Sequence, residues 1–364
     1  MDIQQISAPA VIIDCLHTLN DIEIDGYSEK GGNGYVFFGY HKIMKKRVAL
    51  KFYYYGDDAN KEVELLAQIK HPNIIDVWDA RSVGDGWAYF TTEEIRSGDL
   101  DKHIEANNIG TKKAFNIIRG LLDGVGAMHN EPNNMVHRDL KPANILLDFS
   151  GNPLIADFGS VKRIPEGQSF VSGSQHAALY RPPEVYEQGS YTYSSDIYQI
   201  GMVLYQLLGG YLPYGEQDWL NQAQQKKYNA LPDDFEKSTF VDNLLHTKAK
   251  KGQLLHLDSL PAYVTQAVKR IIRTATNPDF GKRYQTTTEF LLAIHKLGEI
   301  PEWITIDEHI ALINYKGKDY RVVRRGADFV CEKKLSHSAC WRKESGIQEG
   351  TETGIIESIL NKIT

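Results

Sequence analysis

The sequence has 364 residues, which at roughly 100 to 200 residues per domain is enough for two or three structural units. Hydrophobic residues make up 42% and charged residues 24%, close to the average of globular proteins, which excludes a chain disordered throughout. Lys plus Arg number 41 against 47 Asp plus Glu, and this net charge of −6 predicts no strong attraction to nucleic acid or to an anionic membrane.

Cysteine usage and apolar runs indicate the compartment. Cys15, Cys331 and Cys340 are too few and too scattered for a disulfide framework, which favours a reducing environment. The N-terminus lacks the pattern of a secretory signal. The longest apolar stretch, around residues 200–212, is interrupted by Gln206 and is too short to span a bilayer. We therefore expect a soluble, cytoplasmic protein with no membrane association.

The first part of the chain has the composition of β-strands. The β-type runs are residues 35–40, 47–52, 74–80 and 87–92. The first two flank a basic turn at residues 42–46, which predicts a hairpin. Residues 59–70 instead repeat their apolar positions with helical period and end before Pro72, so one helix is predicted between the second and third runs.

After Ser97 the pattern becomes mainly helical. Helices are predicted over residues 100–107, 113–129, 194–208, 262–276 and 287–297. A sheet-forming part followed by a helical part predicts an α+β fold with two lobes and a cleft between them. Residues 215–260 carry Lys248, Lys250 and Lys251, for which we expect a solvated basic loop, with a docking surface as the alternative.

From about Pro301 the pattern changes again to short β-strands. The predicted strands are residues 303–306, 310–315, 320–325 and 329–332, followed by a helix over residues 353–362. Cys331, His337 and Cys340 suggest zinc, but their irregular spacing without a paired Cys-x-x-Cys favours packed thiols. Residues 301–364 hold ten Lys plus Arg and ten Asp plus Glu, so this β-rich appendage carries no nucleic-acid signal.

The strongest chemical signal is a polar motif at residues 137–144, which reads HRDLKPAN, followed by DFG at residues 157–159. Phosphoryl transfer needs a carboxylate to accept the proton of the attacking hydroxyl, and Asp139 suits that task. It also needs oxygen ligands for Mg²⁺, which Asn144 and Asp157 supply. A polar loop between a helix and a strand is the alternative, but the two motifs together disfavour it.

On these motifs the sequence resembles the eukaryotic-type (Hanks-type) serine/threonine protein kinases over about residues 27–297, roughly three quarters of the chain. The resemblance implies a bilobal α+β fold that uses ATP and Mg²⁺ to phosphorylate Ser/Thr hydroxyls of protein substrates. It implies an N-lobe with its extension at residues 1–95, a C-lobe at 96–299 and a small domain of unassigned role at 300–364.

The resemblance also implies roles for single residues. Lys51, in the run VALK, is expected to contact the α- and β-phosphates and to be held by Glu62, which the helical period places on the apolar side of its helix. Asp139 is the expected base, and Lys141 resembles the lysine that neutralises the transferring phosphoryl group in Ser/Thr kinases. Asn144 and Asp157 are the expected metal ligands.

The expected nucleotide site draws on a glycine-rich loop and on the connection between the lobes. Its residues are Gly31, Gly34, Val36, Ala49, Lys51, Glu93, Ile95 and Leu146. Glycine lets backbone amides approach phosphates closely, but Glu29 stands where the family has its first glycine. Thr92 falls at the gatekeeper position, and Asp99 is expected to bind ribose or substrate.

Two further features concern the scaffold and the substrate loop. Glu184, in the run RPPE, is expected to form a buried bidentate pair with Arg283. Ala177 stands where Ser/Thr kinases have a threonine that bonds near the catalytic aspartate and lysine. Because alanine has no hydroxyl, we expect water to substitute or the loop to be arranged differently.

Arg138 resembles the arginine that pairs with a phosphorylated activation-loop residue. Ser172 and Ser174 are therefore the expected autophosphorylation sites, with an unmodified serine-rich loop as the alternative. Because the charged set is complete, an active protein kinase is the first hypothesis for the whole chain. A kinase-fold binding or scaffold protein is the second, because of the departures at Glu29 and Ala177.

Overall fold

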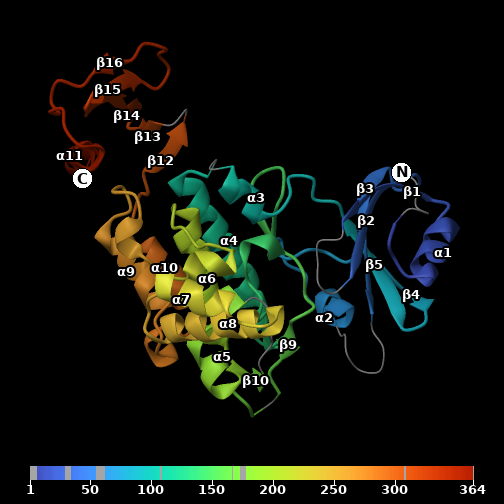
Figure 1. Ribbon diagram of the computed structural model, residues 1–364. Coiled ribbons are helices and arrows are strands. Elements are labelled where there is room, and N and C mark those ends of the chain that lie inside the picture. Colours follow the sequence, from blue (N-terminus) through green and yellow to red (C-terminus); the bar gives the residue numbers. More distant parts are fainter. Residues whose placement is uncertain are drawn as a thin grey trace.

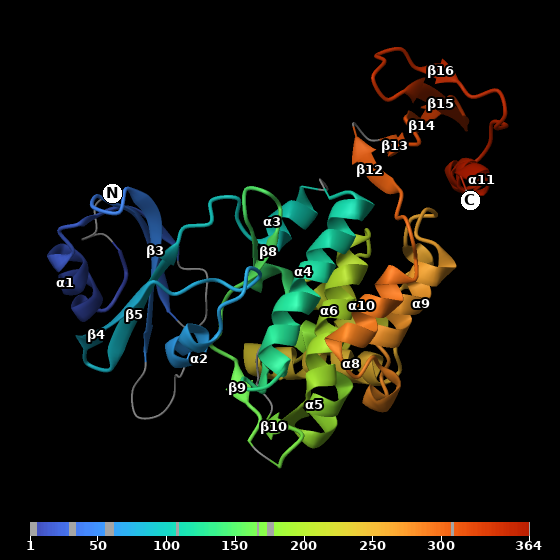
Figure 2. The same ribbon diagram turned by 180° about the vertical axis from the view of Figure 1, so that it is seen from behind.

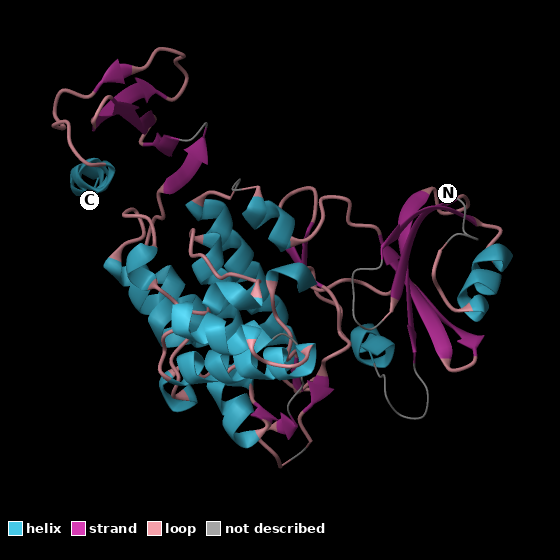
Figure 3. Cartoon of the chain, in the orientation of Figure 1, coloured by secondary structure: helices cyan, strands magenta, loops and turns pink. Residues whose placement is uncertain are grey.

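The computed structural model describes residues 6–28, 34–54, 62–106, 109–165, 167–172, 178–306 and 309–363. Strands gather at the two ends of the molecule, and helices form the body between them (Figure 3). The N-terminal sheet lies on one side of the helical body, and the second sheet lies beyond its other end (Figure 1). This arrangement confirms the predicted α+β class.

The N-terminal sheet is antiparallel, with strand order β1-β2-β3-β5-β4. Its strands are β1 (Ile22–Ser28), β2 (Tyr35–His41), β3 (Lys46–Tyr54), β4 (Asp79–Gly84) and β5 (Trp87–Glu93). The predicted hairpin is confirmed by β2 and β3. The strand expected at residues 74–80 is wrong in place, because β4 begins only at Asp79 and Ile74 makes a single bridge to Ile155.

The two faces of this sheet have different partners, because side chains alternate along each strand. One face turns an aromatic and aliphatic set toward helix α1 (Ala10–Thr18), whose Ile12 is fully buried and Leu16 nearly so. The cluster under this helix consists of Phe37, Val48, Leu50, Phe52 and Tyr89. On the other face, called the inner face below, the register pairs Ala49 with Thr92 and Val36 with Lys51. This inner face is left for the candidate site.

The helical body is built around α4 and α6. Its helices are α3 (Leu100–Glu105), α4 (Thr111–His129), α5 (Pro183–Gln188), α6 (Tyr193–Leu207), α7 (Gln222–Asn229), α8 (Asp234–Lys250), α9 (Gln266–Ala275) and α10 (Thr287–His295). Helix α2 (Glu62–Gln68) lies beside the N-terminal sheet (Figure 1). All residues of α6 after the first are buried, which places this helix in the centre of the core. The predicted helices at residues 100–107, 113–129, 194–208, 262–276 and 287–297 are confirmed, with small shifts of their ends.

The basic loop expected between residues 215 and 260 is wrong, because α7 and α8 occupy most of this stretch. Helix α8 buries Val241, Leu245 and Ala249, which recur every four residues and form one apolar stripe. Its Lys250 forms an ion pair with Glu187 of α5 at 2.6 Å. The stretch is therefore part of the folded body.

The appendage is a five-stranded antiparallel sheet covered by one helix. Its elements are β12 (Glu302–Ile306), β13 (His309–Tyr315), β14 (Lys318–Arg325), β15 (Asp328–Leu335), β16 (Arg342–Lys343) and α11 (Glu352–Ile363). Cys331 is buried among the residues that pack against α11, as expected for a packed thiol, and burial raises its pKa to about 12. Cys340, by contrast, is exposed.

The appendage is joined to the helical body at the start of α4 (Figure 2). The Glu302 carboxylate accepts a hydrogen bond from the backbone N–H of Lys112 at 2.9 Å, which satisfies one of the free donors of the first turn. A Cβ on Gly110 would lie 1.8 Å from Oε1 of Glu302, so a larger residue there would displace this carboxylate. Trp303 stacks on Tyr263, with ring centroids 5.4 Å apart, and closes the junction.

Within the described residues, no helix has both the length and the apolar character needed to cross a membrane.

Candidate active site

The motif at residues 137–144 forms a tight loop between the short strand β6 (Met135–Val136) and β7 (Ile145–Leu147). The Asp139 carboxylate is almost buried and accepts hydrogen bonds through Oδ2 from Nζ of Lys141 and Nδ2 of Asn144, each at 2.9 Å. Nδ2 of Asn144 also donates to the backbone oxygen of Asp139 at 2.8 Å. The loop thus brings together three of the residues expected at the site.

The other oxygen of this carboxylate, Oδ1 of Asp139, is buried and has no hydrogen-bond partner among the described residues. A buried acceptor without a partner costs free energy, so such an atom indicates a place for a missing donor. A substrate hydroxyl is a donor of this kind. The arrangement therefore fits a general base, in which hydrogen bonds fix Oδ2 and Oδ1 can accept the proton of a substrate hydroxyl.

Asp196, a fully buried residue of α6, holds the loop at residues 137–144 in place through hydrogen bonds. Its carboxylate accepts hydrogen bonds from the backbone N–H groups of His137 at 2.8 Å and Arg138 at 2.9 Å, and from His129 Nε2 at 2.8 Å. Burial raises the pKa of Asp196, but the hydrogen bond and charge of His129 outweigh it, and the pKa lies below its ordinary value. Arg138 has a φ of 72°, a left-handed conformation that these bonds support.

The sequence predicts a helix over residues 194–208 but does not reveal this role of Asp196. The signal that was available is an ionisable side chain inside an otherwise apolar helix, which must find partners if it is buried.

Asp157 and Lys51 meet across the two parts of the protein. Nζ of Lys51 on β3 lies 3.0 Å from Oδ1 of Asp157, which also accepts from the backbone N–H of Gly159 at 3.3 Å. Burial raises the pKa of Asp157, but the charge and hydrogen bond of Lys51 outweigh it and the pKa is lowered. Asp157 has a φ of 61°, and such strain in a residue other than glycine is concentrated at functional sites. The side chain of Glu62, expected to pair with Lys51, lies outside what the structure describes.

The inner face of the N-terminal sheet places the other expected nucleotide residues beside Lys51. Val36 and Ala49 lie on the same face as Lys51, and the hydroxyl of Thr92 donates to the backbone oxygen of Asp76 at 2.8 Å. Leu146, on β7, forms a backbone bridge with Asp99, which follows the connection between the lobes.

The structure describes the glycine-rich loop of the expected nucleotide site only in part, and it describes the connection between the lobes fully. At Gly34 a Cβ would lie 2.0 Å from the backbone oxygen of Phe52, so glycine is required where β2 begins. Gly31 and Glu29 lie outside the described residues. At the connection, Glu93 ends β5 opposite Val48, and Ile95 follows it. Asp99 caps α3, and its side chain accepts from the N–H of Lys102 at 3.0 Å.

The expected scaffold pair is confirmed. Nη1 and Nη2 of Arg283 donate to Oε1 and Oε2 of Glu184, both at 2.7 Å, and their side chains are 0% and 3% exposed. The guanidinium also lies 4.7 Å from the ring centre of Tyr198. This bidentate contact fixes α5 against the loop before α10.

The activation segment is described only in part. Arg138 is 5% exposed; its Nε donates to the backbone oxygen of Ser160, and its guanidinium lies 5.9 Å from the ring centre of Tyr191. The backbone of Ser172, in β10 (Val171–Ser172), pairs with Ser190 of β11 (Ser190–Tyr191). Ser174 and Ala177 lie outside the described residues.

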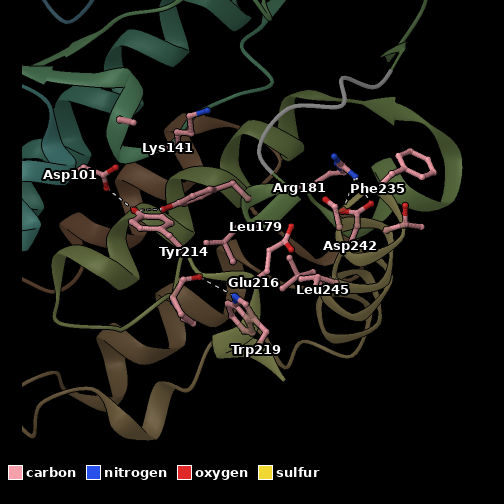
Figure 4. A pocket seen from close by; sticks show the side chains of 16 residues that line it. Asp101, Lys141, Leu179, Arg181, Tyr214, Glu216, Trp219, Phe235, Asp242 and Leu245 are labelled. Atoms are coloured by element: carbon pink, nitrogen blue, oxygen red, sulfur yellow. Dashed lines mark hydrogen bonds and ion pairs between the residues drawn. The ribbon is translucent and has the colours of Figure 1, made fainter. Parts of the chain in front are cut away.

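A hollow of about 720 Å³ opens next to Lys141 (Figure 4). One wall is the segment after residue 178, with Leu179 and Arg181, and helix α8 forms the opposite wall. Figure 4 shows Arg181 pointing toward Asp242, to which its Nη1 donates at 3.1 Å. The hollow thus reaches Lys141, whose Nζ bonds to the expected base Asp139.

Comparison with known proteins agrees with this geometry. A family model described as the protein kinase domain matches residues 29–291. The serine/threonine-protein kinase PrkC of Bacillus subtilis is 29% identical over 272 residues, which are 71% of this chain and 38% of that protein. Ribosomal protein S6 kinase alpha-1 of Mus musculus is 32% identical over 215 residues, 56% of this chain and 29% of that protein. Myosin light chain kinase A of Dictyostelium discoideum is 31% identical over 243 residues, 61% of this chain and 80% of that protein.

Because the family match covers well over half of it, the chain belongs to the protein kinase family. The resemblance to the serine/threonine protein kinases is confirmed by these relatives. The chain spans 38% and 29% of the length of the first two of them.

Proposed function

We propose that this chain is an active protein kinase that transfers the γ-phosphate of ATP to Ser and Thr hydroxyls of protein substrates. The observation that carries the proposal is Asp139, whose buried Oδ1 has no partner among the described residues while Lys141 and Asn144 hold Oδ2. A carboxylate fixed in this way accepts the proton of an incoming hydroxyl. The relatives named serine/threonine kinases support this choice of acceptor.

The remaining charged residues fit the handling of phosphate. Asn144 uses its amide nitrogen for Asp139, which leaves its amide oxygen to join Asp157 as a hard ligand for Mg²⁺. When bound, Mg²⁺ neutralises negative charge on the phosphates. Lys51 binds phosphate oxygens as a cation, oriented by Asp157 and, as expected from the sequence, by Glu62. Lys141, beside Asp139, neutralises charge on the group in transfer.

We propose that ATP lies against the inner face of the N-terminal sheet. The residues assigned to it are Gly31, Gly34, Val36, Ala49, Lys51, Glu93, Ile95 and Leu146. The shared face of Val36, Ala49 and Lys51 supports this assignment, and so does the bridge that joins Leu146 to Asp99 after the connection between the lobes. The hollow beside Lys141 is the proposed place of the protein substrate.

Three further assignments belong to this proposal. We assign residues 1–95 to the N-lobe with its extension, residues 96–299 to the C-lobe, and residues 300–364 to a separate small domain. We place the protein in the cytoplasm.

We assign autophosphorylation to Ser172 or Ser174, since β10 places the backbone of Ser172 one strand from Tyr191, which neighbours Arg138. Mass spectrometry after incubation with ATP, with no phosphate found between residues 160 and 180, would contradict the last assignment.

The test of the main proposal is phosphate incorporation from labelled ATP into a Ser/Thr peptide library, with Mg²⁺ present. Asp139→Asn and Asp157→Ala should each lose at least about 100-fold in rate, because each removes a group that acts in the transition state. Asp123→Asn, on the exposed face of α4, is the matched control and should keep the native rate. Equal incorporation by native protein and Asp157→Ala, or label on tyrosine alone, would refute the proposal.

A further inference from the structure

Gln199 is a buried polar residue of α6 whose side chain bonds to the backbone of two separate segments. It is 1% exposed, although most of its neighbours on this helix are apolar. Its Oε1 accepts from the backbone N–H of Leu140 at 3.0 Å. Its Nε2 donates to the backbone oxygens of Arg138 at 3.2 Å and Tyr180 at 3.3 Å.

The two segments have different tasks at the site. Arg138 and Leu140 are the residues directly before and after Asp139, so their backbone groups determine where the expected base lies. Tyr180 stands between Leu179 and Arg181, and all three line the hollow beside Lys141 (Figure 4). One amide side chain therefore connects the backbone on both sides of the base with the wall of the substrate groove.

The need for such a connection follows from the sequence. Serine/threonine kinases have a threonine at the position of Ala177, and alanine has no hydroxyl to bond near the base. An amide offers both a donor and an acceptor, so it can bond to N–H and C=O groups at the same time. Gln199 presents this amide from α6, where its side chain is buried.

We infer that Gln199 is a positioning residue that couples the substrate-binding wall at Tyr180 to the base Asp139. This inference rests on the proposed phosphotransfer, and it adds a residue to which neither the sequence motifs nor the family match assigns a role. Gln199 touches neither the acceptor hydroxyl nor phosphate, and it acts through the backbone of residues 138–140. A shift of about 1 Å in such a group is enough to cost a large part of the rate.

Gln206 provides a matched control on the same helix. It is also buried, and it also bonds to Tyr180, but through the phenol: the Tyr180 hydroxyl donates to Oε1 at 2.6 Å. Its Nε2 donates to the hydroxyl of Tyr214 at 3.2 Å. These contacts support the wall of the groove, whereas those of Gln199 also hold the loop of the base.

The experiment compares Gln199→Met and Gln206→Met, which keep side-chain length and remove the amide. Gln199→Met should lower kcat by about 10- to 100-fold and raise the peptide KM, because both the base and the wall lose their fixed positions. Gln206→Met should raise the peptide KM and change kcat by less than about threefold. The KM for ATP should stay within about twofold in both, since Lys51 and Asp157 are not bonded to either glutamine.

Hydrogen exchange gives a readout that does not need activity. The amide of Leu140 should exchange faster in Gln199→Met than in the native protein, and at the native rate in Gln206→Met. If the native protein transfers no phosphate, the proposed function fails. In that case the exchange rate of the Leu140 amide alone tests whether Gln199 holds the loop of Asp139. If the native protein is active, equal kcat losses in both variants, or native kcat in a folded Gln199→Met, overturn the inference.

Gln199→Glu covers the case in which Gln199→Met does not fold. Its carboxylate keeps the acceptor for the N–H of Leu140 and loses both donor bonds, to Arg138 and Tyr180. We expect protection of the Leu140 amide to remain and the peptide KM to rise by about fivefold or more. An unchanged KM and kcat in this variant also overturns the inference.

Discussion

The ammonium group of Lys51 lies 3.0 Å from the carboxylate of Asp157, so a strand of the N-terminal sheet and the loop after β8 (Pro153–Ile155) are joined by one ion pair. The lysine side chain is 16% exposed and the aspartate 34%, so the pair is only partly buried. The charge and hydrogen bond of Lys51 outweigh the effect of burial and lower the pKa of Asp157, so this carboxylate is ionised at neutral pH. This geometry agrees with the proposal that Lys51 binds phosphate and Asp157 binds Mg²⁺.

Lys51→Met is expected to reduce phosphate transfer by at least about 100-fold, because it removes the cation that would bind phosphate oxygens. Initial rates with labelled ATP measure this loss, and circular dichroism checks that the variant is folded. Lys70→Met is the control, since Lys70 pairs with Asp76 on the surface, with side chains 66% and 54% exposed. A native rate in Lys51→Met would contradict the role of this residue.

Arg283→Met is expected to cost about 3 to 5 kcal/mol of unfolding free energy, because it leaves the Glu184 carboxylate buried and without its charge partner. Urea unfolding followed by fluorescence measures the difference. The exposed pair of Lys250 and Glu187 should contribute less than about 1 kcal/mol, so Lys250→Met serves for comparison. Similar losses of unfolding free energy in Arg283→Met and Lys250→Met would contradict this expectation.

Ile12→Ala is expected to destabilise the protein by about 2 to 4 kcal/mol, since Ile12 is fully buried between α1 and the sheet. The loss comes from apolar surface returned to water and from the cavity left beside Phe37 and Leu50. Thermal unfolding measures it. Ile43→Ala removes the same atoms from a side chain that is 71% exposed and should change stability by less than about 0.5 kcal/mol.

Glu344→Gln is expected to weaken the appendage in a pH-dependent way. The carboxylate lies 2.6 Å from Nζ of Lys333 and 3.2 Å from Nζ of Lys362. Burial raises the pKa of Glu344. Hydrogen bonds from Lys333, from the N–H of Gly346 and from Lys362 outweigh this effect, and the pKa falls from 4.5 to about 2.

The folded protein then binds fewer protons at Glu344 than the unfolded chain does, so the stabilisation is complete above pH 4.5 and is lost as the pH falls toward about 2. The native protein should therefore exceed Glu344→Gln in stability at pH 7, and the difference should narrow below pH 4.5. Calorimetry at pH 7, 4 and 3.5 tests this. A difference that stays constant over these pH values would contradict the expectation.

The two catalytic motifs were predictable because each is a short run of neighbouring residues. Asp139, Lys141 and Asn144 stand within six positions, so one loop brings them together whatever surrounds it. The buried pair of Glu184 and Arg283 was also predicted, but through resemblance to a family, since nothing in the local sequence joins residues so far apart.

The failures have a common physical cause. The sequence predicts a loop in place of α8 because Lys248, Lys250 and Lys251 cluster at its C-terminal end, while its apolar stripe is only one residue wide per turn. The strand at 74–80 was misplaced because apolar composition alone does not tell a buried loop from a strand. In both cases tertiary packing determined the structure and local composition did not.

By itself the sequence determined the order of the lobes, the strand and helix types of most segments, and the identity of the residues proposed as base and metal ligands. These follow from periodicity and from contiguous motifs, which are local properties of a chain. Only the tertiary structure decided which buried side chains hold the site in place. Asp196 and Gln199 lie about 60 residues from the loop they support, and a hydrogen bond between such distant segments depends on how the core packs, which no local pattern encodes.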